Sequence, residues 1–160
     1  MSNDFYTTSI VPYAGIIIKI CRAYTDSQED FEDFYQEACL QIWKSRTAFQ
    51  EKSKWSTWVY RITLNVCLTL RKKQNRKPYN NDVIPELSEQ NTAFENEHLN
   101  LLYGAIKQLS EVDRAIILLY LEENPYKEIA VIIGTSANNI AVRINRIKKQ
   151  LKTLLDGKIN

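Results

Sequence analysis

The stretch KWSTWVYRITLNVCLTLRKKQNRK, residues 54–77, combines aromatic rings with positive charge. It opens with two tryptophans and a tyrosine, and residues 61–77 then hold six cations and no acid. Aromatic rings stack on unpaired bases and cations neutralise phosphates, so a surface that binds nucleic acid uses both together. A buried core would explain only the rings, and a solvated face only the cations. The stretch therefore predicts a nucleic-acid surface.

Helical spacing divides this stretch into two faces. An apolar arc that we expect to face the core holds Val59, Ile62, Val66 and Leu70. A separate polar stripe holds Arg61, Asn65, Lys72 and Arg76. Trp55, next to Lys54 at the helix entrance, is expected to carry an exposed ring that is free to stack on an unpaired base. Trp58 continues the apolar arc, so for this ring burial and base contact are equally open.

A second nucleic-acid pattern occupies residues 124–156. Asn124 and Pro125 are predicted to start a short helix that ends at Gly134, and Ser136 caps a longer basic helix, the order of a helix-turn-helix. The longer helix has an apolar arc of Ile140, Ile144, Ile147 and Leu151. Residues of its first two turns are placed to reach base edges in the major groove: Asn138, Asn139, Val142 and Arg143. Cations further along are expected to contact phosphates: Arg146, Lys148 and Lys149.

Charge is segregated along the chain, although the net charge is only +2. Residues 26–37 hold six acids and no cation, whereas residues 143–160 hold six cations against a single acid, Asp156. Such blocks suit a protein that contacts one basic partner and one polyanion.

The elements that must position these residues are all helical, because no strand pattern occurs. Pro12 is expected to open a first helix that runs to Tyr24, and Ser27 caps a second. The second helix has an apolar stripe of Phe31, Tyr35, Ala38 and Ile42. A third is predicted from 53–56 to about Asn75, and Ser110 caps another through Leu121. The fold class is all-α.

Residues 77–94 interrupt the helical periodicity with two prolines, three asparagines and several acids. A segment of this length is long for a loop inside one compact domain. We therefore expect a helical domain at 1–76, a flexible linker at 77–94 and a second helical domain at 95–160.

Residues typical of enzymes and metal sites are not arranged in any such pattern. Neither a Walker loop nor triad-like spacing occurs, and Cys21, Cys39 and Cys67 lack the spacing of a zinc site with His98. We expect three reduced thiols in helix cores, no metal, no cofactor and no enzymatic activity. We also expect a cytoplasmic protein without membrane insertion, because neither a secretion signal nor an apolar span is visible.

Three segments together resemble the sigma factors of the extracytoplasmic-function (ECF) group, in the sigma-70 family. DFYQEACLQIW (33–43) is similar to the family's Asp-Leu-Val-Gln-Glu-Val-Phe-Leu-Arg-Leu-Trp segment. FQEKSKWSTWVYRITLNVCLTLRKK (49–73) resembles its phenylalanine-to-tryptophan loop, Trp-Leu-Tyr-Arg-Ile run and basic close. Residues 109–151 resemble its Leu-Pro-x-x-x-Arg opening, Tyr-x-Glu-Ile-Ala helix and Arg-x-x-Arg recognition helix.

The resemblance implies a region 2 helical bundle and a region 4 helix-turn-helix. It implies that Asp33, Gln36 and Glu37 dock on the coiled coil of the largest subunit of core RNA polymerase. It implies that the helix from Trp55 to Lys73, with the loop before it, reads and opens the −10 element as partly single-stranded DNA. The helix-turn-helix would read the −35 element as duplex. An anti-sigma factor, often at the inner membrane, would hold the chain inactive.

Four residues depart from the family pattern: Thr69, Ser110, Asn139 and Ala141. Ser110 replaces a proline and can cap the helix instead, whereas Asn139 and Ala141 leave the −35 sequence open. Two alternatives also stay open. One is a two-domain helix-turn-helix regulator that does not bind polymerase, and the other is a recombinase or transposase fragment, which would need carboxylates around a metal.

Overall fold

The computed structural model describes residues 3–76 and 97–156, and every regular element in those ranges is helical. The chain forms two compact units, residues 1–95 and 96–160. The all-α prediction is confirmed, and the linker predicted at 77–94 lies outside the described residues.

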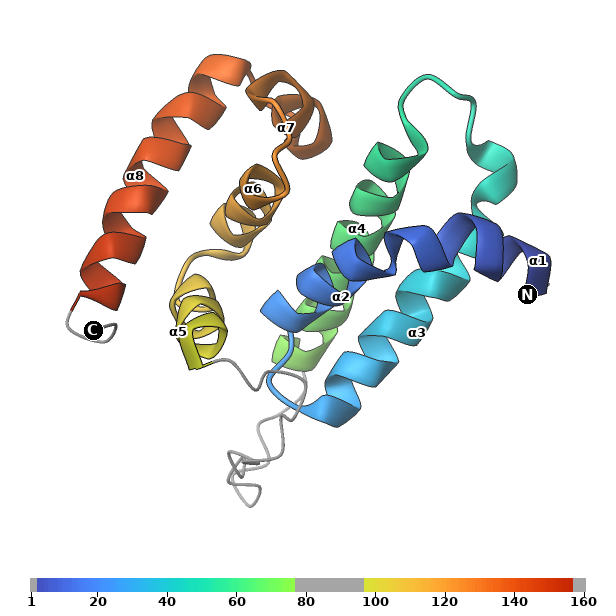
Figure 1. Cartoon of the computed structure of the whole chain (residues 1–160), viewed down its shortest axis with the longest axis horizontal. Coiled ribbons are helices and arrows are strands. Elements are labelled where there is room, and N and C mark those ends of the chain that lie inside the picture. The colour runs from blue at the N-terminus through green and yellow to red at the C-terminus, as the bar shows by residue number, and fades with distance from the viewer. Residues whose placement is uncertain (1–2, 77–96, 157–160) are drawn as a thin grey trace. The chain divides into compact units, whose positions relative to one another are not determined.

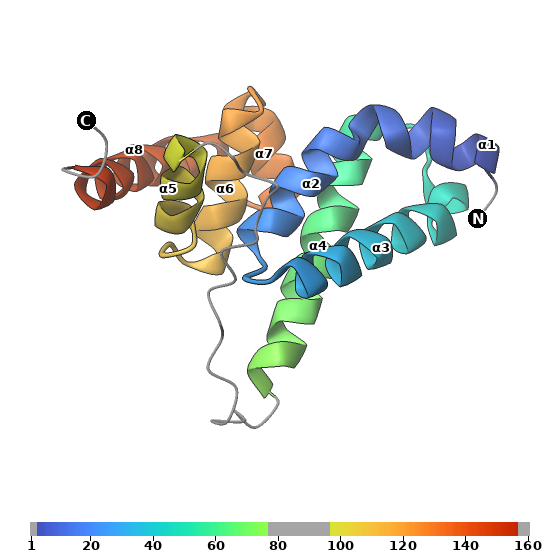
Figure 2. The same ribbon diagram turned by 60° about the horizontal axis from the view of Figure 1, so that its bottom comes forward.

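The first unit is built on three long helices: α2 (Ala14–Ala23), α3 (Gln28–Lys44) and α4 (Trp55–Arg76). Short turns of helix precede and separate them: α1 (Asn3–Phe5), η1 (Tyr6–Ile10), η2 (Val11–Tyr13) and η3 (Arg46–Ala48). α4 packs against both α2 and α3, as Figures 1 and 2 show from two directions. The helical chain thus begins well before Pro12, which lies inside η2 and does not open the first helix.

The core of the first unit contains aliphatic, aromatic and thiol side chains from all three helices. The Sγ atoms of Cys21 and Cys67 lie 3.9 Å apart between α2 and α4, and Cys39 is buried on α3. The hydrogen bond to Cys21, together with burial, raises the pKa of the Cys67 thiol, and burial raises the pKa of Cys39 to about 11. The predicted reduced thiols in helix cores are therefore confirmed as free, buried cysteines.

The buried face of α4 is rotated from the predicted apolar arc. Val59 and Val66 are buried, but Ile62 and Leu70 are only half-buried. The side chains that complete the core are Tyr60, Thr63, Leu64 and Cys67. The cause is that α4 contacts two helices, so its buried face spans more than one arc of apolar residues.

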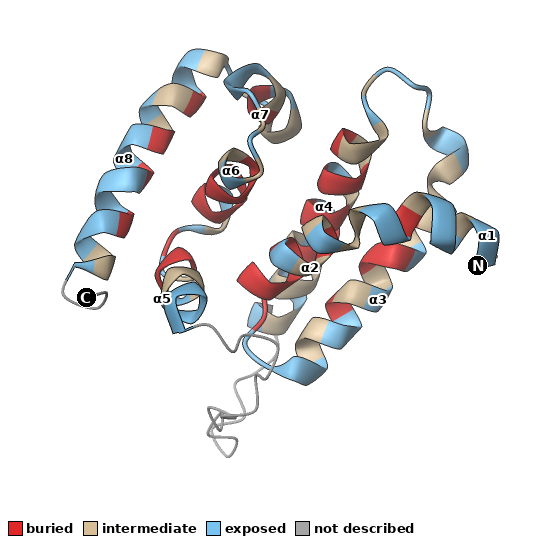
Figure 3. Ribbon diagram, in the orientation of Figure 1, coloured by how far each residue is buried: buried red, intermediate tan, exposed pale blue. Residues whose placement is uncertain are grey.

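The second unit contains α5 (Glu97–Ile106), α6 (Glu111–Leu121), α7 (Tyr126–Ile133) and α8 (Ala137–Leu155). The predicted arc of α8 is confirmed, because Ile140, Ile144 and Ile147 are fully buried and Leu151 nearly so. Figure 3 shows buried segments, in red, along one side of α8 and exposed segments, in pale blue, along the other. The stripe packs on α5, α6 and α7.

Serine hydroxyls cap three helices as the sequence predicts. Ser27, Ser110 and Ser136 each accept a hydrogen bond from the backbone N–H three residues on, at 3.1–3.2 Å. Gly134 ends α7 with φ +88°, a left-handed conformation that favours glycine. Asn124 differs from the prediction, because its side-chain amide donates to the Leu119 carbonyl at 2.8 Å and thus caps the end of α6.

We predict that Ile144→Ala destabilises the second unit by about 2–5 kcal/mol, because the truncation leaves a cavity in a fully buried stripe. Val142→Ala, on the exposed side of the same helix, is the matched control and should change stability by less than about 0.5 kcal/mol. Urea unfolding followed by helical circular dichroism measures both variants. Equal losses would contradict this division of α8 into faces.

Candidate nucleic-acid and protein interfaces

The exposed face of α8 carries most of the residues predicted to contact duplex DNA. Asn138, Val142 and Lys149 are exposed, and Val142 keeps 66% of its surface accessible. Asn139 is also exposed, but its amide donates to the Thr135 hydroxyl at 2.7 Å. The bond fixes the Asn139 side chain against the turn, so Asn138 and Val142 are better placed to meet base edges.

Arg143 and Arg146 both contact one buried carboxylate, Asp113 of α6. Arg143 Nη2 lies 3.1 Å from Asp113 Oδ1, and Arg146 Nη2 lies 3.5 Å from Oδ2. The Asp113 side chain is only 10% exposed, and that of Arg143 is 26% exposed. Arg143 was predicted to read bases, but in the structure its guanidinium is directed toward Asp113 and links α8 to α6. Arg146 is 58% exposed and can still reach a phosphate.

Lys148 also contacts its own unit. Its Nζ lies 4.5 Å from the centre of the Tyr120 ring, a cation–π arrangement. A hydrogen bond with Tyr120 raises the pKa of Lys148. Lys149 is therefore the better candidate for a phosphate contact on this turn.

The polar side of α4 is exposed as predicted. Lys54, Arg61, Asn65 and Lys72 are all exposed, whereas Arg71 is half-buried and pairs with Asp26 at 3.3 Å. The side chain of Arg76 lies outside the described residues. A row of two cations and an amide thus remains accessible along α4, with Lys54 just before its first turn.

Trp55 does not carry the exposed, free ring that the sequence predicts. Its Nε1 donates to the Ser9 carbonyl at 2.9 Å, and its ring packs edge-on against Phe5 and Phe49 at 6.1 and 5.1 Å. Trp58 is half-buried, with its ring 5.5 Å from that of Phe49. Both tryptophans therefore contact the protein itself, and a contact of either ring with DNA stays a prediction.

The acidic face of α3 exposes the residues predicted to contact a basic partner. Asp33 and Gln36 are exposed, and Leu40 beside them is 36% exposed. Glu37 is half-buried and accepts a hydrogen bond of 2.8 Å from Gln41 Nε2. Carboxylates with an adjacent apolar side chain suit a partner that presents both cations and aliphatic groups.

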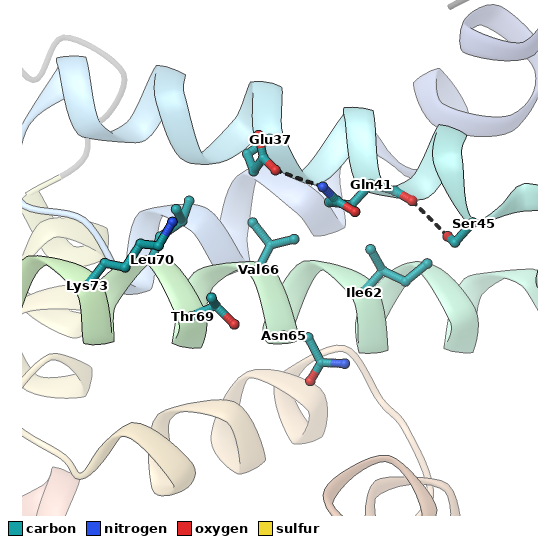
Figure 4. A pocket seen from close by; sticks show the side chains of 9 residues that line it. All are labelled: Glu37, Gln41, Ser45, Ile62, Asn65, Val66, Thr69, Leu70 and Lys73. Atoms are coloured by element: carbon teal, nitrogen blue, oxygen red, sulfur yellow. Dashed lines mark hydrogen bonds between the residues drawn. The ribbon is translucent and has the colours of Figure 1, made fainter.

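A groove of about 360 Å³ lies between α3 and α4. Glu37, Gln41 and Ser45 line its α3 side, and the half-buried Ile62 and Leu70 with Val66 form an apolar floor from α4 (Figure 4). Asn65, Thr69 and Lys73 form the polar edge on the α4 side. Glu37 of the acidic face of α3 and Asn65 of the polar side of α4 therefore border one groove.

Among residues 3–76 and 97–156, no group of three or more His, Cys, Asp or Glu could hold a metal ion. No helix in the described ranges is both long and apolar enough to span a membrane.

Comparison with known families gives two matches in chain order. The sigma-70 region 2 model matches residues 10–77, and the sigma-70 region 4 model matches residues 99–151. The first match covers α2, α3 and α4, and the second covers most of α5, all of α6 and α7, and most of α8.

Curated relatives are ECF RNA polymerase sigma factors. The chain is 28% identical to SigG of Mycobacterium tuberculosis over 89% of its own length, but it spans about half (46%) of that relative. It is 27% identical to the sigma-E factor of Escherichia coli, covering 89% of this chain and 82% of that one. It is 25% identical to SigW of Bacillus subtilis, covering 95% and 91%.

Solved structures share the fold. The sigma factor RpoE of Bartonella quintana, in complex with the anti-sigma factor NepR, aligns with a TM-score of 0.74 at 20% identity. The alignment covers 98% of this chain and 99% of that one. CnrH, in complex with the cytosolic domain of CnrY, aligns with a TM-score of 0.69 at 17% identity, covering 97% and 90%.

We predict that Arg143 and Asp113 are energetically coupled. Arg143→Ala and Asp113→Asn should each destabilise the second unit, and the double variant should lose about 0.5–3 kcal/mol less than the sum of the two. Urea unfolding of the parent protein, the two single variants and the double variant gives the four stabilities that this double-mutant cycle compares. Additive losses would show that the ion pair is not formed in solution.

Proposed function

The chain belongs to the sigma-70 family, in its ECF group, and from this premise we propose that it directs core RNA polymerase to promoters. The observation that carries the proposal is the ordered pair of region 2 and region 4 matches, each on a helical unit with an exposed basic helix face. It would bind core polymerase, recognise the −10 and −35 elements and melt the DNA. A regulator that does not bind polymerase is not favoured, because it would not need a region 2 unit.

The −35 element is the proposed ligand of α8, bound as duplex DNA. Asn138 and Val142 would meet base edges in the major groove, since an amide can pair with adenine and a methyl group can contact thymine. Lys149 and the exposed guanidinium of Arg146 would contact phosphates. Asn139 would act through the turn that its amide holds, and Arg143 would orient α8 through Asp113.

The −10 element is the proposed ligand of α4 and of the loop at 49–54. Arg61, Lys72 and Lys54 would neutralise phosphates beside Asn65, with Trp58 at the loop end of this surface. Flipping a base out of the duplex costs a few kcal/mol, and a loop that accepts only fitting bases would offset that cost selectively. Sequence reading and strand opening would then be one event, driven by binding energy without enzymatic chemistry or a cofactor.

The polymerase is the proposed partner of the acidic face of α3. Asp33, Gln36 and Glu37 would dock on the coiled coil of the largest subunit, and the exposed Leu40 would add apolar contact. An anti-sigma factor is a further proposed partner, because both solved structures described above are complexes. One contains the anti-sigma factor NepR, and the other contains the cytosolic domain of CnrY. The chain would work in the cytoplasm, and a membrane-bound anti-sigma factor would hold it at the inner membrane.

We expect that the purified chain, added to bacterial core polymerase, initiates transcription on a subset of a random promoter library. Sequencing of the transcript starts should show paired upstream motifs at −10 and −35. Core polymerase alone is the control. Binding of the chain to promoter DNA without any gain in initiation would support the regulator instead.

We expect Asn138→Ala and Lys149→Ala to affect promoter binding differently. Asn138→Ala should reduce discrimination among −35 variants by about 1–3 kcal/mol, because an amide contact to a base edge is lost. Lys149→Ala should weaken binding to all promoters by the same factor. It should also reduce the slope of log binding constant against log salt concentration by about one, because one phosphate contact is lost. Holoenzyme binding to variant promoters at several salt concentrations measures both. A uniform loss for Asn138→Ala would remove it from base reading.

A further inference from the structure

Five aromatic rings form a continuous cluster at one end of the first unit. Phe5 packs edge-on against Trp43 at 5.2 Å and against Trp55 at 6.1 Å. Phe49 packs against Trp55 at 5.1 Å and against Trp58 at 5.5 Å. We name Phe5, Trp43, Phe49, Trp55 and Trp58 the ring cluster. Phe5 is its connecting member, because it joins the end of α3 to the start of α4.

The cluster depends on a segment that precedes the region 2 match. That match begins at residue 10, and Phe5 and Ser9 lie in residues 3–9, which form α1 and most of η1. The Ser9 carbonyl accepts the hydrogen bond of Trp55 Nε1, at 2.9 Å. Residues 3–9 therefore hold Trp55 by two independent contacts, one polar and one aromatic.

The loop at 49–54 has both of its ends in the ring cluster. Phe49 stands at its start, and Trp55 follows its end as the first residue of α4. The loop itself is not helical, and Glu51 within it has φ +56°, a conformation that is strained for a residue with a side chain. A strained, irregular loop keeps one conformation only where its surroundings determine it, and here the rings at its two ends do so.

We propose that residues 3–9 position the loop at 49–54 for −10 DNA, with Phe5 as the positioning residue. The proposal rests on the function proposed above and adds to it the segment that sets the loop geometry. Trp55 then acts as an anchor and not as a stacking platform. Loss of the Phe5 ring should let the loop sample other conformations, which fit the preferred flipped base less well and so distinguish it less from other bases.

Hydrogen exchange of the full chain, without polymerase, tests the positioning directly. Phe5→Ala should speed amide exchange at 49–54 by about tenfold and leave the core of α4 at 59–67 unchanged. Phe5→Tyr keeps the ring and should match the parent protein. Val11→Ala, a nearby truncation of an exposed apolar residue, is the control and should also match it. Unchanged exchange at 49–54, or an equal rise throughout α4, would overturn the proposal.

Promoter opening tests the consequence in the holoenzyme. Phe5→Ala should bind core polymerase as the parent does, but form open complexes about 2- to 10-fold less well, the range expected for lost aromatic contacts. Its discrimination among −10 variants, measured as the ratio of open complexes formed on the preferred and on the altered −10 sequences, should also narrow. Lower stability alone would not change this ratio. Phe5→Leu, which conserves apolar bulk and so protects folding, should show the same narrowing. Unchanged −10 discrimination in both variants would overturn the proposal.

The two measurements separate the failure of this proposal from that of the function. If the parent protein and core polymerase open no promoter, the proposed function fails, while the exchange measurement still decides whether residues 3–9 hold the loop. If the parent opens promoters and Phe5→Ala does so with equal rate and discrimination, only the positioning role fails.

Discussion

Burial of one side of each basic helix is the constraint on which the rest of the structure depends. α8 can present Asn138 and Val142 only because Ile140, Ile144 and Ile147 are fixed against three other helices. α4 presents Arg61 and Lys72 in the same way, since its opposite side is buried on α2 and α3. A rigid apolar contact thus determines which polar groups are exposed for the proposed DNA contacts. Rotation of either helix about its axis would bury these polar groups and expose the apolar ones.

Periodic and local features could be predicted from the sequence, whereas contacts between distant residues could not. The stripe of α8 and the three serine caps depend on spacings of three or four residues, which a helical wheel and a capping rule capture. Trp55 and Arg143 were assigned to DNA because their local sequence is aromatic or basic. Their partners, Ser9 and Asp113, are far away in the chain, so no local pattern could reveal that both side chains are engaged.

The first unit carries surfaces of opposite charge on different helices, α3 and α4. The acids of α3 and the cations of α4 lie on adjacent elements, and Glu37 and Lys73 border the same groove. Just before α3, Asp26 pairs with Arg71 of α4. Close pairing of all these charges would neutralise both faces. Most of the charged side chains instead point to solvent, so each face keeps the potential that attracts its own partner.

Asp113 shows how an arginine can have a structural role while positive charge remains on the surface. One carboxylate contacts two guanidinium groups, so the three groups keep a net charge of about +1. The less exposed Arg143 offsets the cost of burying Asp113, and the more exposed Arg146 directs the remaining charge outward. Because the carboxylate belongs to α6, it also sets the rotation of α8 about its axis. The same ion pairs that stabilise this unit would therefore orient the face of α8 that we propose to contact DNA.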